Sequence, residues 1–387
     1  MIKKILKLMT RLLVIVVALF SIYLANLFLM KPYSIDHYLG KELVLGLVDS
    51  PEALTYVGIL DRFNWLTKHN SRLSIPEEND LEEGIKELEK GIKTLYKYKD
   101  SSLTDVQKVT KKIAIFDLEN NLKELKEFPY LDYPLNQIGG IHLNTIEFMS
   151  DMHPVRTKSE ANDFIKRVEL IRDVYEGTLK DLEKQANSGI YPPEFVYGHV
   201  INQLNDFINY SFEEHPLYTQ FMMKVKELNI TDKELDDFDK RIKKAIEDSV
   251  TPGFKLLLGF MERTKKNANK NHGIWSQPGG DDYYKLRIRT YTTTDYTPEF
   301  IHQTGLSEVE RITNRMREIL TSLGYDTSKS VGQLMNELNE NPDFLYADTP
   351  DRKEIIVNDY TEMVNEAIEV MTEYFHTMPK SDVVVKA

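Results

Sequence analysis

Residues 159–182 read SEANDFIKRVELIRDVYEGTLKDL, and their large apolar side chains recur at steps of three and four residues. This period places the apolar side chains on one face of an α-helix and the charged ones on the other. The stripe consists of Phe164, Val168, Ile171, Tyr175, Leu179 and Leu182. Ser159 is a suitable N-cap, and Gly189 is a suitable residue to end the helix. We therefore predict a long helix that packs through one face.

Segments before and after this helix also contain residues that predict the beginnings and ends of helices. Thr231 and Glu234 form a capping box, and we expect the helix that they begin to end near Thr251-Pro252. Residues 131–154 contain two prolines and predict a packed loop with a short helix. Further helices are predicted from 49–52, over 80–99, over 104–128, from 193, over 307–323 and over 349–375. The predicted fold class is therefore all-α, with a large multi-helix body.

The helical pattern stops between Asn271 and Tyr296. Glycines and a proline at 273–280 predict turns, and β-branched and aromatic residues follow. We predict at most a short hairpin near residues 283–292. Val383-Val384-Val385 also resembles the beginning of a strand, which requires a partner strand to be stable.

The first thirty residues predict a membrane anchor. Four basic residues, Lys3, Lys4, Lys7 and Arg11, precede the uncharged run Leu12–Met30. As a helix, this run of nineteen residues spans roughly 28 Å, which matches the hydrocarbon core of a bilayer. We expect an uncleaved, single-pass anchor through residues 12–30, with the N-terminus in the cytoplasm and the body outside. A cleaved signal peptide is the alternative, although no small-x-small cleavage site is visible. The predicted domains are 1–31, the anchor, and 32–387, the helical domain.

Composition excludes several classes of function. The net charge is −12, from 61 acidic and 49 basic residues. Such a surface repels phosphate backbones, so we expect no nucleic-acid partner. The chain has no cysteine, which excludes disulfides, thiolate zinc sites and thiol nucleophiles.

Motifs for metal-dependent or nucleophilic hydrolysis are missing from the sequence. None of the nine histidines lies four residues from another, whereas a zinc hydrolase helix needs that spacing. Glu299 with His302, and Glu373 with His376, have a spacing of three, which suits two ligands on one helix face but also suits a surface ion pair. No Gly-x-Ser-x-Gly elbow and no phosphate-binding loop is present. We therefore predict no catalytic residue and no metal ligand in this chain.

Two tyrosines and two arginines follow the glycine-rich turn. Tyr283 and Tyr284 could supply phenol donors to a substrate groove, or simply pack in the core. Arg287 and Arg289 alternate along the same stretch and could bind a carboxylate in bidentate fashion. Ion pairs with acidic residues on a neighbouring helix are the alternative explanation for both arginines.

Several motifs together resemble a known family. The run from Trp275 to Thr290 contains Ser-Gln-Pro-Gly-Gly-Asp-Asp-Tyr-Tyr, and the run from Tyr296 continues Thr-Pro-Glu-Phe-Ile-His-Gln-Thr-Gly-Leu. Gly189-Ile-Tyr-Pro-Pro193 and Thr251-Pro-Gly-Phe254 lie upstream in the same order, and Phe375-His-Thr-Met-Pro-Lys380 lies downstream. From about Leu131 onward the chain is similar to the bacterial domain of unknown function 885, a helical family with features of zinc metallopeptidases.

The resemblance implies a groove between helical lobes and a metal site on a later His-Glu-x-x-Pro-Gly-His-His-like element. This sequence ends at Ala387 without that element. The resemblance therefore implies that zinc binds only if a further C-terminal part is supplied, and that this chain alone binds no cofactor. The family positions that it suggests for the groove are His302, Gly280 and Tyr284. Together with Arg287, whose guanidinium could bind a carboxylate, they are the candidate substrate-binding residues.

Three hypotheses follow from the sequence. The first is an anchored, extracytoplasmic protein equivalent to the non-catalytic part of a zinc peptidase, truncated or split and inactive alone. Its partners would be the bilayer and a separately encoded C-terminal half. The second is a peptide-binding pseudoenzyme that keeps the groove without the chemistry. The third is an active metal-dependent peptidase with scattered ligands such as Glu299, His302 and Glu373.

Overall fold

The computed structural model describes residues 2–386, apart from the side chains of residues 2–6 and 8. These residues are largely helical and contain no sheet, which confirms the all-α class; the one isolated bridge joins Pro193 and Asn269. The chain divides into a unit that ends at Asp295 (unit 1) and a unit that begins at Tyr296 (unit 2).

The helices of unit 1 are α1 (Ile2–Leu29), α2 (Ile35–Asp49), α3 (Pro51–Val57), α4 (Asn64–Thr67), α5 (Asp80–Tyr96), α6 (Asp105–Glu127), α7 (Ile141–Glu147), α8 (Lys158–Asn187), α9 (Glu194–Asn209), α10 (Pro216–Lys226), α11 (Asp232–Ala245), α12 (Thr251–Thr264) and α13 (Gly280–Thr292). Unit 2 contains α14 (Pro298–Ser322), α15 (Val331–Glu340) and α16 (Arg352–Met371). Short 3₁₀ turns are η1 (Asp61–Phe63), η2 (His69–Ser71), η3 (Asp100–Ser102), η6 (Lys265–Asn267), η7 (Ile274–Ser276) and η8 (Pro342–Phe344), and π-turns are η4 (Phe148–Met152) and η5 (Ile246–Val250).

Helix α1 is long and apolar enough to cross a membrane over Met9–Leu29. Nearly all of its side chains lie outside the protein core, as expected for a segment that lipid would cover. A signal sequence near the N-terminus meets the same criteria of length and composition. The chain therefore has a potential membrane-spanning helix, as predicted.

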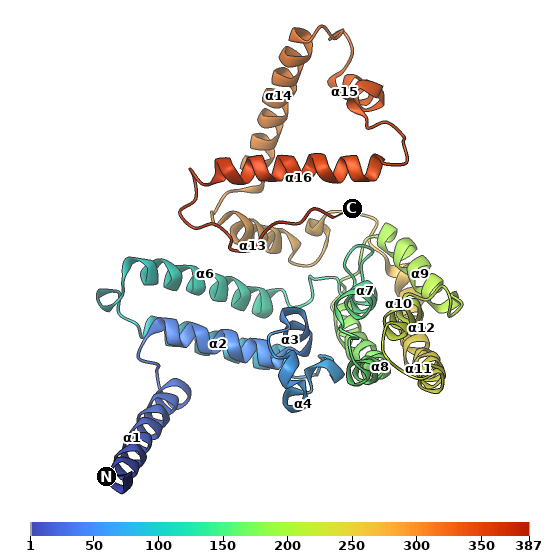
Figure 1. Ribbon diagram of the computed structural model, residues 1–387. Helices are drawn as coiled ribbons and strands as arrows, with labels where there is room; N and C mark the ends of the chain where they lie inside the picture. The colour runs from blue at the N-terminus through green and yellow to red at the C-terminus, as the bar shows by residue number, and fades with distance from the viewer. Residues whose placement is uncertain (1, 387) are drawn as a thin grey trace. The chain divides into compact units, whose positions relative to one another are not determined.

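Helix α8 organises the main core of unit 1. The predicted stripe is confirmed: Phe164, Val168, Ile171 and Tyr175 are fully buried. They pack with α12 and the π-turn η5, and α12 in turn packs with α9. These helices lie at one end of unit 1, while α2 and α6 run alongside each other at the other end (Figure 1). The N-cap is Thr157 rather than Ser159, because the Thr157 side chain accepts a hydrogen bond from the backbone N–H of Glu160.

The predicted helix end near Thr251-Pro252 is wrong. Helix α11 passes through η5 directly into α12, and Pro252 lies in the first turn of α12. A proline is tolerated there because the wider π-turn before it already interrupts the regular hydrogen-bond ladder. The same turn directs Ser249 at α8: its hydroxyl donates to the Glu169 carbonyl (2.9 Å) and accepts from the Arg172 N–H (3.0 Å).

The predicted hairpin at residues 283–292 is also wrong, because this segment is helix α13. Gly279, at φ 72°, turns the chain into the helix, and Asp281 and Asp282 lie in its first turn, where acidic side chains are favoured. Leu286 and Ile288 are buried within unit 1. Tertiary burial thus outweighs the strand propensity of the aromatic and β-branched residues. The tail at 383–385 forms no strand either.

Arg167 of α8 is fully buried and connects α8 to residues 51–72. Its guanidinium donates to the backbone carbonyls of His69 (2.7 Å) and Arg72 (2.7 Å) and to the Thr55 hydroxyl (2.8 Å). Burial lowers the pKa of Arg167 to about 10. Carbonyl dipoles, rather than a paired carboxylate, therefore compensate most of the desolvation of this cation.

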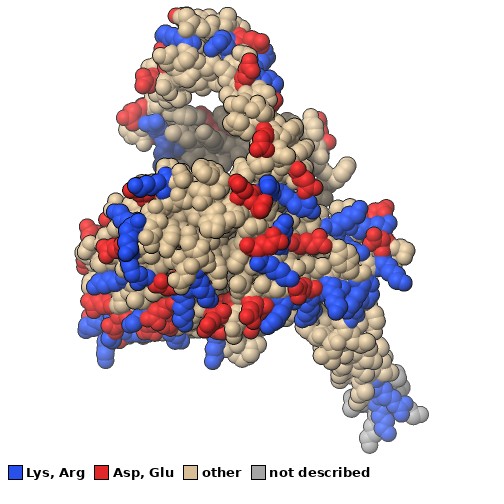
Figure 2. All heavy atoms as spheres, turned by 180° about the vertical axis from the view of Figure 1, so that it is seen from behind, with Lys and Arg blue, Asp and Glu red and all other residues tan. Residues whose placement is uncertain are grey.

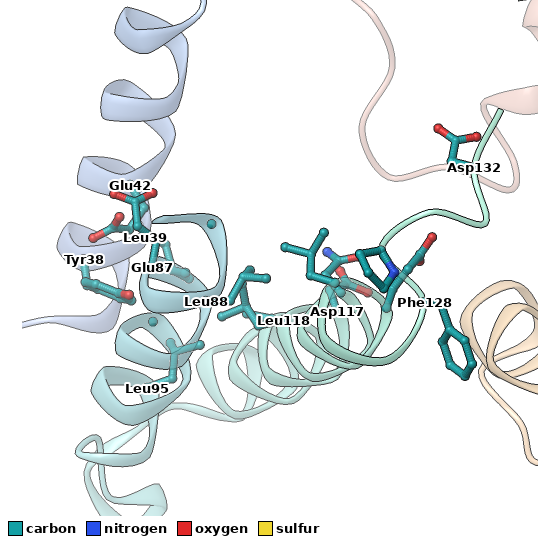
Figure 3. A pocket seen from close by; sticks show the side chains of 17 residues that line it. Tyr38, Leu39, Glu42, Glu87, Leu88, Leu95, Asp117, Leu118, Phe128 and Asp132 are labelled. Carbon is teal, nitrogen blue, oxygen red and sulfur yellow. The ribbon is translucent and has the colours of Figure 1, made fainter. Parts of the chain in front are cut away.

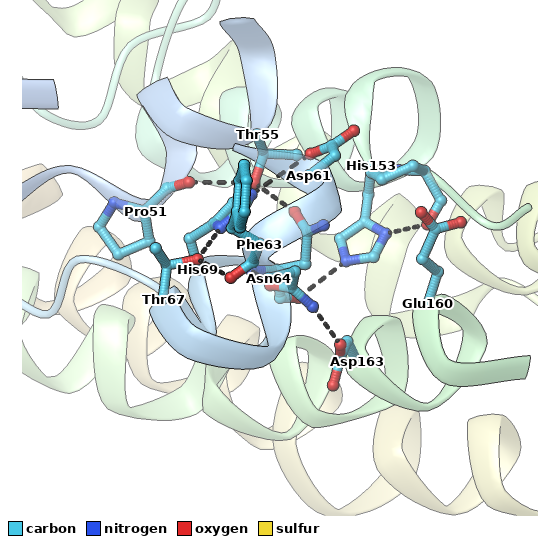
Figure 4. A network of polar contacts seen from close by, with 12 residues as sticks. Pro51, Thr55, Asp61, Phe63, Asn64, Thr67, His69, His153, Glu160 and Asp163 are labelled. Atoms are coloured by element: carbon cyan, nitrogen blue, oxygen red, sulfur yellow. Dashed lines mark hydrogen bonds and ion pairs between the residues drawn. The ribbon is translucent and has the colours of Figure 1, made fainter. Parts of the chain in front are cut away.

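Polar contacts around Arg167 extend this connection (Figure 4). The Asn64 amide donates to the Asp163 carboxylate of α8 at 2.9 Å, and His153 Nε2 lies 2.9 Å from the Asn70 carbonyl. Burial lowers the pKa of His153 to about 3, despite two neighbouring carbonyls that favour a protonated ring. His153 is thus neutral in the folded protein, and a neutral ring can donate from only one nitrogen.

Unit 2 has very little core of its own. Among its described residues, the buried apolar side chains are Leu320 and Leu334. The predicted amphipathic helix exists as α14, yet Leu306, Val309 and Leu323 of its stripe are more than half exposed. Amphipathicity without burial indicates a surface that this chain, as described, leaves uncovered.

The free energy of unfolding should fall as the pH falls below about 6.5. Burial lowers the pKa of His215 to about 4, so below about pH 6.5 the unfolded chain binds a proton that the folded chain excludes. His215 also caps α10 by accepting from the Leu217 N–H. The His215→Asn variant keeps a capping acceptor and removes the titration. Urea unfolding measures the free energy of unfolding between pH 7 and 4. Plotted against pH, this free energy should change less steeply in His215→Asn than in the wild type, by up to about 1.4 kcal/mol per pH unit. Identical slopes would contradict this account.

Candidate functional site

A groove lies between α2, α5 and α6 of unit 1. Its volume is about 840 Å³, which is in the range of small-molecule and peptide sites. Figure 3 shows Leu88 of α5 and Leu118 of α6 pointing into the space between their helices. The apolar lining consists of Tyr38, Leu39, Leu88, Leu95, Ala114, Leu118, Leu125, Phe128 and Pro129. We call this site the α2–α5–α6 groove.

Two glycines set the distance between the helices that form the groove. Gly84 and Gly91 lie seven residues apart on one face of α5 and both line the groove. A Cβ atom at Gly91 would lie 3.3 Å from Leu118 Cδ1 and 3.5 Å from the Tyr38 hydroxyl oxygen, and one at Gly84 would lie 3.4 Å from Leu125 Cδ1. The glycines therefore allow α5 to approach α6 closely and keep the groove open.

The rim of the groove is acidic. Glu42, Glu87, Asp117, Glu124 and Asp132 line it, and no lysine, arginine or histidine does. Glu42 pairs with Lys41 at 2.7 Å and Glu124 with Arg287 at 3.0 Å. Within the part of the chain that the structure describes, the other three carboxylates form no ion pair. An apolar floor with unpaired carboxylates at its edge suits a ligand that is both apolar and cationic.

The α13 helix closes one end of this region through Glu124. The Tyr283 hydroxyl donates to Glu124 Oε1 (3.3 Å), and the Tyr283 ring contacts Phe128, with 5.6 Å between the ring centroids. Burial and the charge of Glu124 raise the pKa of Tyr283 to about 12. Because Glu124 and Phe128 also line the groove, α13 holds two of its wall residues in place.

Three of the four residues suggested for substrate binding lie on α13. Gly280 is buried at the start of the helix, and Tyr284 is 44% exposed. Arg287 is half-buried, and its guanidinium forms an ion pair with Glu124 of α6. An ion pair with a neighbouring helix was the alternative explanation for this arginine. Arg289 instead pairs with Asp295 at 2.5 Å, so the two arginines do not form a joint carboxylate site.

The candidate metal ligands belong to unit 2. Glu299 and His302 share the first turns of α14 and are both exposed. Glu373 and His376 follow the end of α16, so the helical spacing expected for this pair is wrong. Across residues 2–386, no group of three or more histidine, aspartate or glutamate side chains is arranged to hold a metal ion.

Sequence reasoning missed the groove itself. The available signal was the pair Gly84 and Gly91, seven residues apart in an otherwise strong helix former. Glycine is unfavourable in a helix, so its recurrence on one face indicates close packing or a surface that must stay open. The acidic residues at the rim gave no such signal, because acids are common along all of these helices.

The fold and the groove define an all-α protein with a potential membrane-spanning helix and a ligand-sized groove. Residues 51–387 match the family described as bacterial protein of unknown function (DUF885), so the chain belongs to this family. The match begins 80 residues upstream of Leu131, where the resemblance first became visible in the motifs.

Two solved structures share the fold. The crystal structure of a "putative lipoprotein" from Colwellia psychrerythraea has 24% sequence identity and a TM-score of 0.76, and the match covers 88% of this chain and 60% of that one. A "putative lipoprotein of unknown function" from Shewanella oneidensis has 14% identity and a TM-score of 0.54, covering 85% and 59%. This chain therefore spans about three fifths of each structure. Comparison with curated proteins finds no match.

Replacing Gly280 by alanine should destabilise unit 1. A Cβ atom there would lie 1.8 Å from the Ile274 carbonyl oxygen, so the η7–α13 turn would have to move, at a cost of roughly 1–3 kcal/mol. Gly198→Ala, in the interior of α9 with nothing within 4 Å, is the matched control and should stabilise slightly. Urea unfolding of both variants measures the difference. Equal stabilities would show that the turn has no strict need for glycine.

Proposed function

We propose that this chain is a membrane-anchored, extracytoplasmic scaffold that corresponds to the non-catalytic part of a zinc-peptidase-like hydrolase. Helix α1 crosses the bilayer once, and the four basic residues before it keep the N-terminus in the cytoplasm. The metal ligands come from polypeptide outside residues 1–387, whether on the same chain or on another.

The sparse core of unit 2 carries this proposal. Leu320 and Leu334 are its buried apolar residues among those described, while α14 and α16 expose a series of large apolar side chains. These are Phe300, Leu306, Val309, Ile312, Ile319, Leu323, Ile355, Tyr360, Met363, Val370 and Met371. A unit of this size needs more buried apolar surface than two leucines supply to offset its conformational entropy. Additional polypeptide would cover these faces.

The comparisons add support of a coarser kind. Both solved relatives are longer, and this chain spans about three fifths of each. The remaining two fifths of such a fold could pack against α14 and α16 and supply the metal ligands that the family resemblance implies. Zinc would then supply a Lewis acid and an activated water, and the residues of this chain would position and shield that site.

The α2–α5–α6 groove favours a second candidate function, peptide binding without cleavage. Its apolar floor suits leucine or phenylalanine side chains, and Glu87, Asp117 and Asp132 suit lysine or arginine beside them. Such binding needs no metal ion, and the groove is built entirely from unit 1.

The scaffold proposal predicts uneven protection of backbone amides in the full chain. In detergent micelles, amides of α14 and α16 should exchange hydrogen orders of magnitude faster than those of α8 and α12, because few buried contacts resist local opening. Purified protein should carry less than stoichiometric zinc and cleave no peptide. Equal protection of both units would contradict the scaffold role. Stoichiometric zinc that His302→Ala removes would establish the active-peptidase alternative instead.

The peptide-binding candidate predicts charge-dependent binding at the groove. A short basic peptide with leucine and phenylalanine anchors should bind the chain in zwitterionic nanodiscs, and empty nanodiscs give the background. Glu87→Gln with Asp117→Asn should weaken binding about threefold to tenfold, since each exposed pair contributes modestly. The control is Glu82→Gln with Glu119→Gln, on the same two helices but outside the groove. If the two double variants bind equally, the groove is not the peptide site.

A further inference from the structure

A lysine-rich pocket lies where α1 leaves the membrane-spanning segment. Its volume is about 360 Å³, and its lining combines the last apolar residues of α1 with lysines from three parts of unit 1. The apolar residues are Phe28, Leu29 and Met30, and the lysines are Lys31, Lys41, Lys90 and Lys97. We call this site the juxtamembrane lysine pocket. It adjoins the α2–α5–α6 groove, because Tyr38, Glu42, Glu87 and Gly91 line both.

The chain that leaves α1 is fixed by side-chain hydrogen bonds. Asn26, which is buried, donates to the Lys31 carbonyl (3.0 Å) and accepts from the Tyr33 N–H (2.9 Å). The hydroxyl of Tyr98 donates to the Pro32 carbonyl at 2.8 Å. These bonds hold the end of the apolar helix against α2 and the end of α5. The pocket is therefore built into the junction between anchor and body.

The charge of the pocket is opposite to that of the whole protein. The chain carries −12, yet four lysines and two glutamates line this site, which gives the lining a net charge of +2. Glu42 is paired with Lys41 at 2.7 Å. Lys90 and Lys97 form no ion pair within the described residues, and Lys31 lies over the Tyr98 ring at 4.4 Å. Three of the four ammonium groups are thus available to an anion.

Lys90 lies on α5 and Lys97 is the C-cap residue that directly follows it, so both side chains project from the end of one helix. Lys90, Thr94 and Lys97 have spacings of four and three residues, so they share one helix face. In the space-filling view, basic side chains gather where the apolar helix joins the body (Figure 2). The cations therefore converge at the level where phospholipid headgroups would surround the end of α1.

We propose that the juxtamembrane lysine pocket binds the phosphate headgroup of an anionic phospholipid. Lys31, Lys90 and Lys97 contact the phosphate, and Phe28, Leu29 and Met30 contact the adjoining glycerol and acyl carbons. Lipid is favoured over a soluble phosphate because the apolar wall of the pocket is the end of the membrane-spanning segment itself. This inference rests on the proposed retention of α1 as a membrane anchor.

Native mass spectrometry of the full chain in detergent micelles tests the site. Phosphatidylglycerol should bind at least about tenfold more tightly than phosphatidylcholine. Lys90→Gln with Lys97→Gln should weaken phosphatidylglycerol binding about 10- to 30-fold, because each lysine near an anionic headgroup contributes roughly fivefold. The control is Lys86→Gln with Lys93→Gln, which has the same spacing on α5, removes the same charge and lies outside the pocket. This control variant should keep the wild-type preference for phosphatidylglycerol over phosphatidylcholine.

Three results would overturn the proposal: equal binding of the two lipids, equal losses in the two double variants, or lysine-dependent binding of inorganic phosphate to lipid-free protein. Alkaline carbonate extraction of membranes tests the anchor separately. Release of the chain by carbonate would refute the anchored function, whereas retention without lipid preference would refute the pocket alone.

Discussion

A buried cation holds unit 1 together. Arg167 of α8 is inaccessible to water and donates to three backbone carbonyls of residues 51–72, and the Asn64–Asp163 hydrogen bond joins the same segment to α8. Taking a guanidinium out of water is costly, so the position is stable only while these acceptors surround it. Residues 51–72 follow α2 directly. The contacts of Arg167 therefore also position the C-terminal end of α2, a helix that lines the groove.

Helix α2 connects the two sites described above. Tyr38 lines both the α2–α5–α6 groove and the juxtamembrane lysine pocket. Its pKa is raised to about 12 by burial and by the neighbouring carboxylate of Glu42, so the phenol stays protonated and can donate. An acidic-rimmed groove and a basic pocket thus share a wall. A ligand in the groove and a headgroup in the pocket would both contact Tyr38.

The two units contrast in how they bury apolar surface. In unit 1, the stripe of α8 meets complementary apolar residues on α12 and η5, and α12 in turn packs against α9; close approaches such as Gly253 against Tyr175 tighten the contact between α8 and α12. In unit 2, the stripe of α14 has the same sequence pattern but remains exposed. Periodicity shows which face of a helix must be covered, but it does not show what covers it.

The sequence by itself determined the helical class, the capping box at Thr231, the α8 stripe and the apolar N-terminal helix, because these depend on contacts within a few residues. Only the tertiary structure decided that 283–292 is a helix, that α11 continues into α12 and that Arg287 is paired with Glu124. Each of these depends on partners far away in the sequence: the burial of Leu286, the insertion of Ser249 into α8, and a carboxylate 163 residues away. Local propensity differs by at most about 1 kcal/mol per residue between such alternatives, so long-range burial and ion pairing decide among them.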